Sequence, residues 1–320
     1  MGGVYRVGFE FAPAQGEFNA ARDAHWALVD PAARIITGSF MASDNEAVPY
    51  RLWPAEHPRA LVLMLHGAFD YSGAFDEIAP QLLAHGVAGM AIDQRGFGAT
   101  ASRGGWRGKH RMMRDAIEAV AFLKERFGAE LPVFIIGESM GAALAVHVAS
   151  RSPDLALAGL VLAAPGAVSG TWRQLISATL VRALKAVLPQ SEVVIERMSA
   201  WEFTPAAAIR LLSDPMVLRR IKPAAMFGLF KLSRSAVAEA NHVSIPTLTM
   251  VGTREDLMRT DCIERLHANL KGEKTWASFA GGPHLLLHWK HSERVMARVL
   301  SFIETHTTET PDVSPPRPAC

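Results

Sequence analysis

Residues 133–150, VFIIGESMGAALAVHVAS, decide the fold. The segment opens with the short apolar run VFII, continues with a serine between two glycines, and ends in an unbroken helix-forming run. A short apolar run that stops at a turn is typical of a strand buried on both faces, as in a parallel sheet. We therefore expect a strand, a sharp turn at Ser139 and a helix.

The same alternation extends over most of the chain. Further short apolar runs occupy residues 60–65, 87–92, 157–163 and 247–251. Helical patterns separate them, at residues 75–85, 110–127, 141–151 and 260–270. Strands that alternate with helices in this way form parallel sheets covered on both faces. The sequence thus predicts an α/β fold with a mostly parallel, doubly wound sheet.

The composition excludes several classes of protein. The 320 residues are 49% hydrophobic and 20% charged, as in an ordinary globular protein, and the net charge of +2 gives no basic footprint for nucleic acid. The only cysteines, Cys262 and Cys320, lie far apart, so no metal site or cofactor is expected. Neither a signal peptide nor a membrane span is evident, which predicts a soluble cytoplasmic protein. No oligomeric state follows from the sequence.

One long segment interrupts the alternation. Residues 168–241 show helical patterns and no convincing strand, and residues 172–188 repeat apolar positions at three- and four-residue steps. An insertion between two strands of such a sheet is expected to form a helical cap over the ligand-binding edge. The alternative is a set of helices that only enlarges the core. The rest of the chain is expected to divide into an N-terminal surface segment (1–33), the core of the α/β domain (34–167 and 242–308) and a disordered, proline-rich tail (309–320).

Ser139 lies in the pentapeptide GESMG, residues 137–141. A nucleophilic serine needs a strand, a sharp turn and a helix, and all three are predicted here. Glycines two residues to either side leave room for the turn, and the helix N-terminus adds a positive partial charge. We expect Ser139 to be a nucleophile rather than part of a merely structural turn.

A serine hydroxyl attacks only when a histidine accepts its proton and an acid orients that histidine. His284 lies in a loop, GGPH, after the strand-like residues 275–279. His288 is one helical turn further along, and His242 precedes a strand, at its wrong end. His284 is therefore the expected base.

The acid is expected in the loop that follows residues 247–251. Two adjacent carboxylates, Glu255 and Asp256, lie there. Neighbouring side chains in an extended loop point in different directions, and the residues alone leave both candidates open.

An oxyanion hole needs two preorganised backbone N–H groups. One belongs to the residue after the nucleophile, Met140. The other is expected from the loop His66-Gly67-Ala68, with Ala68 as donor and His66 bracing the turn. Phe69, the next residue, is expected to contact the substrate.

Five motifs together resemble the monoacylglycerol lipase and lysophospholipase branch of the α/β-hydrolases. They are LHGAFDYS (65–72), AIDQRGFG (91–98), IGESMG (136–141), VGTREDLM (251–258) and GGPHLLL (281–287). They come in that branch's order and spacing, and the likeness covers about residues 50–303. Within 91–98 we read Asp93 and Arg95 as structural residues beside the site.

The resemblance implies an α/β-hydrolase fold and a helical cap that lines an acyl-chain tunnel. It also implies the identity of the acid, since the branch has an aspartate three residues after the glycine that corresponds to Gly252. Glu255 occupies that position, with Leu257 and Met258 as the aliphatic pair that follows, so this chain departs from the usual aspartate. Asp256 stands one place late and is kept as the alternative.

The expected function is hydrolysis of carboxylic esters, in particular of monoacyl lipids such as lysophospholipids or monoacylglycerols. The mixed apolar and basic cap suggests transient contact with a membrane surface. A short-chain esterase or a peptidase with the same triad is the alternative among enzymes. An inactive ligand-binding protein of the same fold is the alternative from another class.

Overall fold

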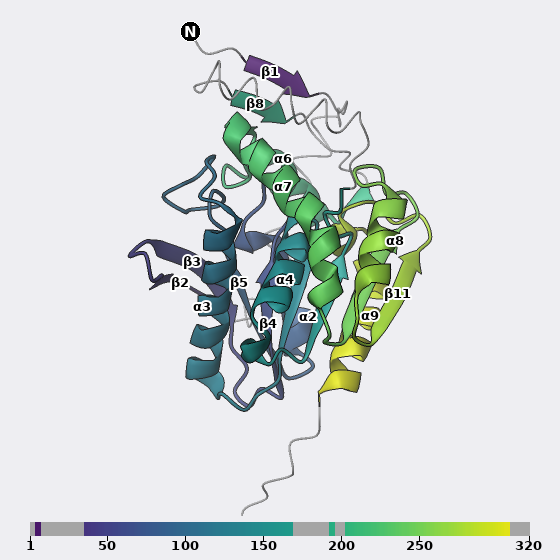
Figure 1. Cartoon of the computed structure of the whole chain (residues 1–320). Helices are drawn as coiled ribbons and strands as arrows, with labels where there is room; N and C mark the ends of the chain where they lie inside the picture. Colours follow the sequence, from purple (N-terminus) through teal and green to yellow (C-terminus); the bar gives the residue numbers. More distant parts are fainter. Residues whose placement is uncertain (1–3, 8–34, 169–191, 196–201, 308–320) are drawn as a thin grey trace, which may run out of the picture.

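A computed structural model describes residues 4–7, 35–168, 192–195 and 202–307. An eight-stranded sheet organises them, in the order β11-β10-β7-β6-β4-β5-β3-β2 (Figure 1). Its strands are β2 (Ile36–Met41), β3 (Ala47–Trp53), β4 (Ala60–Leu65), β5 (Val87–Ile92), β6 (Val133–Glu138), β7 (Gly159–Ala163), β10 (Thr247–Gly252) and β11 (Lys274–Phe279). The strands β4, β5, β6, β7, β10 and β11 run parallel to one another, whereas β3 is antiparallel to β5 and to β2.

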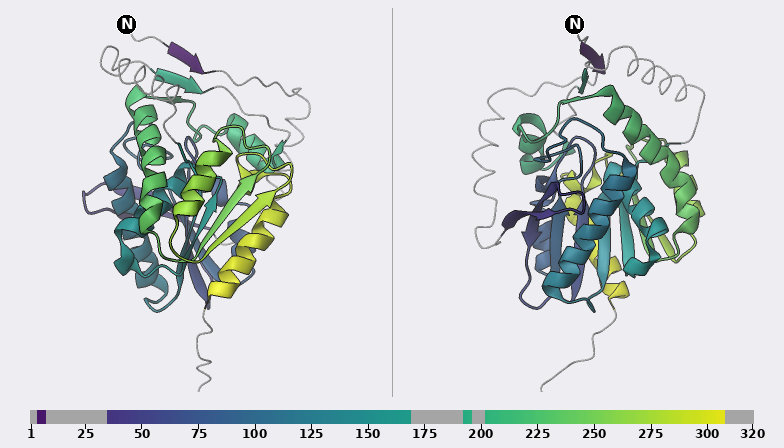
Figure 2. Two further views of the ribbon diagram at one scale, coloured as in Figure 1. Left: turned by 45° about the vertical axis from the view of Figure 1, so that its right-hand side comes forward. Right: turned by 60° about the vertical axis from the view of Figure 1, so that its left-hand side comes forward.

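Helices cover both faces of the sheet (Figure 2). They are α2 (Ala79–Leu83), α3 (Lys109–Phe127), α4 (Met140–Arg151), α6 (Pro205–Ser213), α7 (Pro223–Glu239), α8 (Thr260–Asn269) and α9 (Ser292–His306). Short 3-10 helices are η1 (Ser72–Phe75), η2 (Pro153–Leu155), η4 (Ala240–His242) and η5 (Leu286–His288). The predicted doubly wound α/β fold is confirmed.

The sheet separates two hydrophobic cores. One lies under α3, α4, α7 and α8, and the other lies under α2 and α9. Every residue of β4, β5, β6, β7 and β10 is buried, because both faces of these strands are covered. This explains why their sequences are continuous apolar runs rather than alternating ones.

The edge strand β2 differs from these central strands. Residues 37, 38 and 39 of β2 are exposed in succession. Among the described strands, β2 pairs with β3 alone. Exposed polar residues on an edge strand limit its pairing with other chains. Neither β2 nor β3 was predicted as a strand.

The prediction that residues 168–241 contain no strand was wrong. The strands β8 (Glu192–Ile195) and β9 (Arg220–Ile221) lie in this segment, and β8 pairs with β1 (Val4–Val7) to make a second, three-stranded sheet. The run Glu-Val-Val-Ile has high β-propensity but is too short to stand out between helical patterns. Residues 169–191, which include the whole predicted helical stretch 172–188, lie outside the described residues, as do 1–3, 8–34, 196–201 and 308–320.

Helix α7 runs along α4, opposite the sheet (Figure 1). Its buried positions include Leu229, Leu232, Ala236 and Val237, which join the core beneath α4. The Nε2 atom of His147 in α4 lies 3.2 Å from the carbonyl oxygen of Leu232. The C-terminal half of α7 is thus packed as part of the core, while α6 lies beyond the carboxyl ends of the strands (Figure 2).

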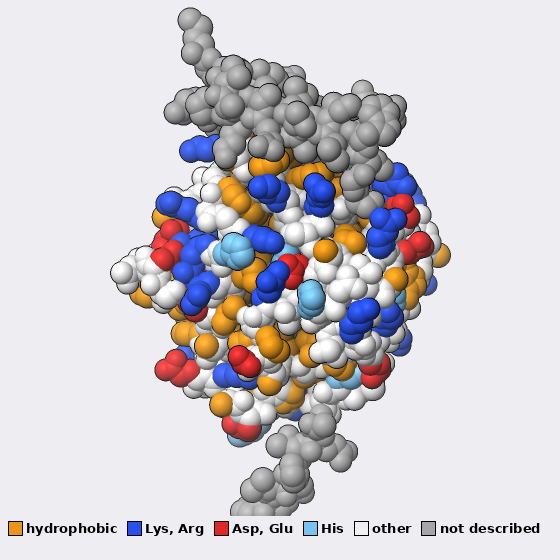
Figure 3. All heavy atoms as spheres, in the orientation of Figure 1, with side chains coloured by type: hydrophobic (Ala, Val, Ile, Leu, Met, Phe, Trp, Pro, Cys, Tyr) orange, Lys and Arg blue, Asp and Glu red, His pale blue; other side chains and the backbone are white. Residues whose placement is uncertain are grey.

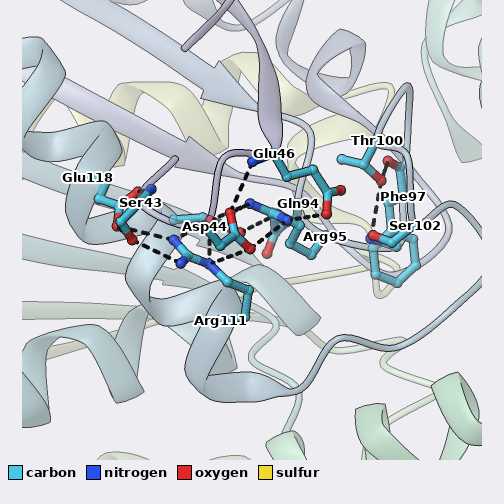
Figure 4. Close-up of polar contacts among 12 residues, drawn as sticks. Ser43, Asp44, Glu46, Gln94, Arg95, Phe97, Thr100, Ser102, Arg111 and Glu118 are labelled. Carbon is cyan, nitrogen blue, oxygen red and sulfur yellow. Dashed lines mark hydrogen bonds and ion pairs between the residues drawn. The ribbon is translucent and has the colours of Figure 1, made fainter. Parts of the chain in front are cut away.

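A buried arginine joins the β2–β3 hairpin to the loop after β5 (Figure 4). The side chain of Arg95 is 0% exposed and forms ion pairs with Asp44, Glu46 and Asp115. Arg111 adds ion pairs with Asp115 and Glu118. Asp93 accepts hydrogen bonds from the backbone N–H groups of Ser72 and Ala99. These contacts agree with the structural role expected for Asp93 and Arg95.

Among the residues that the structure describes, no helix is both long enough and apolar enough to cross a lipid bilayer.

Candidate active site

Ser139 lies at the turn between β6 and α4. Its backbone has φ 52° and ψ −111°, outside the regions that L-residues ordinarily occupy. Its N–H donates to the carbonyl oxygen of Ala163 at 2.9 Å, and its own carbonyl accepts from the N–H of Gly166 at 2.8 Å. These bonds hold the serine in the strained conformation, with its side chain at the carboxyl end of the sheet.

The two flanking glycines are required by the tight packing of this turn. A Cβ atom on Gly141 would collide with the carbonyl oxygen of Leu65 in the neighbouring strand β4. A Cβ atom on Gly137 would collide with the backbone of Gly141 and Ala142 at the start of α4. The pentapeptide therefore lets the strand, the turn and the helix approach one another closely.

The loops after β10 and β11 are joined by backbone hydrogen bonds. The N–H of Arg254 donates to the carbonyl of Gly282 at 2.9 Å, and the N–H of Thr253 donates to that of Phe279 at 2.9 Å. The N–H of Gly281 donates to Oγ1 of Thr253 at 2.8 Å. Because β10 and β11 are adjacent and parallel, these bonds bring the loop carrying the predicted acid against the loop carrying His284.

The structure brings Ser139, His284 and Glu255 into one chain of hydrogen bonds. Nε2 of His284 lies 2.8 Å from Oγ of Ser139. Nδ1 of the same ring lies 2.8 Å from Oε1 and 2.7 Å from Oε2 of Glu255. The His284 and Glu255 side chains are only 2% and 1% exposed. With the proton on Nδ1 held by the carboxylate, Nε2 is free to accept the serine proton.

The backbone of its own loop also stabilises the Glu255 carboxylate. Oε1 accepts the N–H groups of Leu257 at 2.9 Å and of Met258 at 2.8 Å. Burial raises the pKa of Glu255, but the bonds to His284, Met258 and Leu257 outweigh it and leave that pKa below its usual value. The glutamate therefore stays ionised at neutral pH, as an orienting acid must.

The alternative residues lie elsewhere. Asp256 is exposed, and both ring nitrogens of His284 are taken up by Ser139 and Glu255. His288 is buried against Glu138, with Nε2 and Oε2 3.0 Å apart. His242 is exposed in η4, at the opposite end of the sheet from Ser139.

The predicted oxyanion loop passes next to the serine. An ideal Cβ atom on Gly67 would lie 3.6 Å from Cβ of Ser139, so the Ala68 residue that follows is close to the reacting group. His66 braces this loop: its Nδ1 lies 2.7 Å from the carbonyl of Gly67, and its Nε2 accepts the N–H of Gln94 at 3.1 Å. Phe69 has a φ of 75° and is partly buried against the core. Met140 begins α4 and is buried.

Two buried pairs of polar side chains near the site were not predicted. Glu138, the variable residue before the serine, pairs with His288 and accepts the N–H of Leu287 at 3.0 Å. Asp70, two residues after the predicted oxyanion donor Ala68, pairs with Arg210 of α6. The partners are separated by 140 or more residues, so no local pattern could have indicated either pair.

Comparison with known proteins identifies the family. The model of the family described as "Serine aminopeptidase, S33" matches residues 56–290. The chain is 26% identical to the monoglyceride lipase of Homo sapiens over 286 residues, which cover 86% of this chain and 92% of that protein. It is 24% identical to a monoglyceride lipase homolog of monkeypox virus, over 82% of this chain and 94% of the relative.

Solved structures share the fold. A soluble variant of monoglyceride lipase from Saccharomyces cerevisiae superposes with a TM-score of 0.74 at 18% identity, covering 88% of this chain and 97% of the other. The monoacylglycerol lipase of Paleococcus ferrophilus gives a TM-score of 0.67 at 21% identity, covering 85% and 99%. These findings confirm the predicted α/β-hydrolase fold and the predicted class of enzyme. The chain therefore belongs to the serine aminopeptidase S33 family, in the branch of carboxylic ester hydrolases that resemble monoglyceride lipase.

Proposed function

We propose that the protein hydrolyses the ester bond of monoacyl lipids, with monoacylglycerols as the preferred substrates and lysophospholipids as the next candidates. The observation that carries the proposal is the buried chain of hydrogen bonds from Glu255 through His284 to the hydroxyl of Ser139. The names of the full-length relatives support the substrate class, since several are monoglyceride lipases.

In the proposed mechanism, Ser139 attacks the ester carbonyl while His284 takes the hydroxyl proton at Nε2. The backbone N–H groups of Ala68 and Met140 stabilise the oxyanion of the tetrahedral intermediate. His284 then protonates the leaving alcohol, and an acyl group remains on Ser139. A water molecule, deprotonated by His284, attacks the acyl-enzyme and releases the fatty acid. Glu255 keeps the imidazole in the required tautomer and stabilises its charged form throughout.

We assign acyl-chain binding to the predicted cap, residues 168–241, and to Phe69. On α7, Met226, Phe227 and Phe230 are half-buried, and Nζ of Lys231 lies 4.9 Å from the ring centre of Phe227. On the face drawn in Figure 3, hydrophobic side chains adjoin Lys and Arg side chains along the edge next to the grey residues. Apolar and basic side chains placed together suit transient contact with an anionic lipid surface.

A panel of substrates tests the proposal. Glycerol and nitrophenol monoesters with acyl chains from acetyl to palmitoyl are compared with a lysophospholipid and an aminoacyl amide, using the wild type and Ser139→Ala. We expect kcat/KM to rise with chain length, and Ser139→Ala to lower kcat by about 10⁶, as expected when a catalytic serine is removed. The substituted protein should still fold, because alanine leaves the backbone contacts in place.

Each alternative function gives a different result in the same panel. A preference for acetyl esters would indicate a short-chain esterase, and cleavage of the amide in preference to the esters would indicate a peptidase. A wild type that turns over none of the substrates and does not react with a fluorophosphonate would indicate a ligand-binding protein without catalysis. Undiminished turnover by pure Ser139→Ala would refute the assignment of the nucleophile.

A further inference from the structure

We propose that helix α6 positions the oxyanion loop, and that Arg210 is the positioning residue that couples the two. The inference rests on the proposed function of Ala68 as an oxyanion donor. It goes beyond that function because it makes the docking of a segment of the predicted cap a condition for catalysis.

We define the oxyanion loop as residues 66–71. Its last three residues each form a hydrogen bond or an ion pair with α6 or with the turn that follows α6. The carbonyl of Phe69 accepts the N–H of Leu218 at 2.7 Å. The carboxylate of Asp70 forms an ion pair with Arg210. The hydroxyl of Tyr71 donates to Oδ2 of Asp214 at 2.6 Å. Thus every residue from Phe69 to Tyr71 is held by α6 or by residues 214–218, which follow it.

The central contact of the three is buried. The Asp70 and Arg210 side chains are each only 8% exposed, and burial of an unpaired charge is strongly unfavourable. The other carboxylate oxygen of Asp70, Oδ1, accepts the N–H of Tyr71 at 3.0 Å, so the carboxylate joins the loop backbone to the helix. When α6 is docked, Asp70 has a charged partner and the loop has a single arrangement.

The loop needs such anchoring because of its backbone conformation. Phe69 has φ 75°, a value that a residue with a bulky side chain adopts only when its surroundings impose it. The residue next to it, Ala68, is the proposed donor to the oxyanion. Relaxation of Phe69 toward an ordinary φ would reorient the peptide between Ala68 and Phe69, and the preceding peptide, which carries the N–H of Ala68, would shift with it.

Helix α6 is held at its other end by contacts that do not involve this loop. Thr204 is its N-cap: its Oγ1 accepts the N–H of Ala207 at 3.2 Å and donates to Oε2 of Glu77 at 2.7 Å. Thr204→Ala would therefore remove contacts of α6 that lie away from the loop, while the contacts of Arg210, Asp214 and Leu218 still hold the helix against the loop. It provides a matched control for substitutions of Arg210.

The experiment compares Arg210→Met, Arg210→Lys, Tyr71→Phe and Thr204→Ala with the wild type on a monoacylglycerol, with active sites counted by fluorophosphonate labelling. We expect Arg210→Met to lower kcat by about 100-fold, because misplacement of a catalytic group by about 1 Å has an effect of that size. The acid limb of the pH profile should stay unchanged, since the His284–Glu255 pair is not altered. Arg210→Lys, which keeps the charge, should recover part of the loss. Tyr71→Phe should lower kcat by a smaller factor than Arg210→Met, and Thr204→Ala should leave kcat near that of the wild type.

Hydrogen exchange of the peptide covering residues 66–75 gives a readout that does not depend on turnover. We expect faster exchange of this peptide in Arg210→Met than in Thr204→Ala. Any of three results would overturn the inference: a kcat of Arg210→Met equal to that of the wild type, equally fast exchange of this peptide in Arg210→Met and Thr204→Ala, or a loss of kcat in Thr204→Ala as large as that in Arg210→Met. If the wild type hydrolyses no ester, the proposed function fails, while the exchange comparison still decides whether Arg210 anchors the loop.

Discussion

Exchange of Glu255 for glutamine tests the assignment of the acid by removing its charge while keeping its shape. Oε1 of Glu255 accepts hydrogen bonds from Leu257 and Met258, and both carboxylate oxygens face Nδ1 of His284. A glutamine must keep its oxygen at the Oε1 position, because only an acceptor can satisfy the two backbone N–H groups. Its amide nitrogen then occupies the Oε2 position, 2.7 Å from Nδ1 of His284 in the present structure.

Two donors repel each other at this distance, so the amide favours the tautomer in which Nδ1 of His284 is the acceptor, although Nδ1 also lies 2.8 Å from the oxygen that is kept. The ring proton then moves to Nε2, the atom that lies 2.8 Å from the hydroxyl of Ser139. In that tautomer the histidine cannot accept the serine proton. Loss of the correct tautomer lowers kcat by about 10⁴ in serine hydrolases, which corresponds to about 5 kcal/mol of transition-state stabilisation.

Steady-state kinetics of Glu255→Gln and Asp256→Asn on the same ester make the comparison. We expect kcat to fall by about 10³–10⁴ for Glu255→Gln and to change by less than about twofold for the exposed Asp256→Asn. Circular dichroism of both proteins controls for misfolding. If Asp256→Asn has the larger effect, Asp256 is the acid and the loop spacing on which Glu255 was chosen is wrong.

Three further predictions concern stability and its dependence on pH. Arg95→Met removes a buried guanidinium from Asp44, Glu46 and Asp115, of which Asp44 and Asp115 keep an ion pair with Arg111. It should lower the free energy of unfolding by about 3 kcal/mol in urea titrations, whereas Arg59→Met, which breaks an exposed ion pair, should lower it by about 1 kcal/mol or less. Gly141→Ala should lower the melting temperature far more than Gly67→Ala, because a Cβ atom collides with backbone oxygens at Gly141 and makes only ordinary contacts at Gly67; equal shifts would contradict this account of the turn. The folded-state pKa of Glu255 is below the ordinary 4.5, so its contribution to stability is present above pH 4.5 and is lost as the pH falls through the folded-state pKa. The stability difference between the wild type and Glu255→Gln should therefore shrink below that pH, and a difference that grows on acidification would refute the assignment.

The central part of the fold could be predicted from sequence because its strands are buried on both faces. Residues 60–65 and 87–92 became β4 and β5 with the predicted bounds, since a continuous apolar run has few other places in a globular protein. The edge strand β2 and its neighbour β3 were missed. Their burial is mixed, and in β2 small and polar residues stand where the apolar run would be expected.

The candidate site was predictable where it depends on a motif and unpredictable where it depends on distant contacts. Glu255 was chosen over its neighbour by spacing from Gly252, and the structure brings it to His284, although the catalytic roles of both residues stay predictions. The pair of Asp70 with Arg210 had no such signal, because an arginine on a helix ordinarily faces solvent. Only the tertiary structure buries it.

The positive φ of Ser139 means that the molecule gives up stability where it is expected to perform chemistry. A residue held in such a conformation lowers the stability of the folded state by about 1–3 kcal/mol relative to an unstrained one. Glycine adopts this conformation without strain, so Ser139→Gly would relieve it while removing the reactive hydroxyl. Selection for a more stable chain and selection for a reactive serine therefore act in opposite directions on this one residue. A screen for heat resistance alone would favour the loss of the proposed nucleophile.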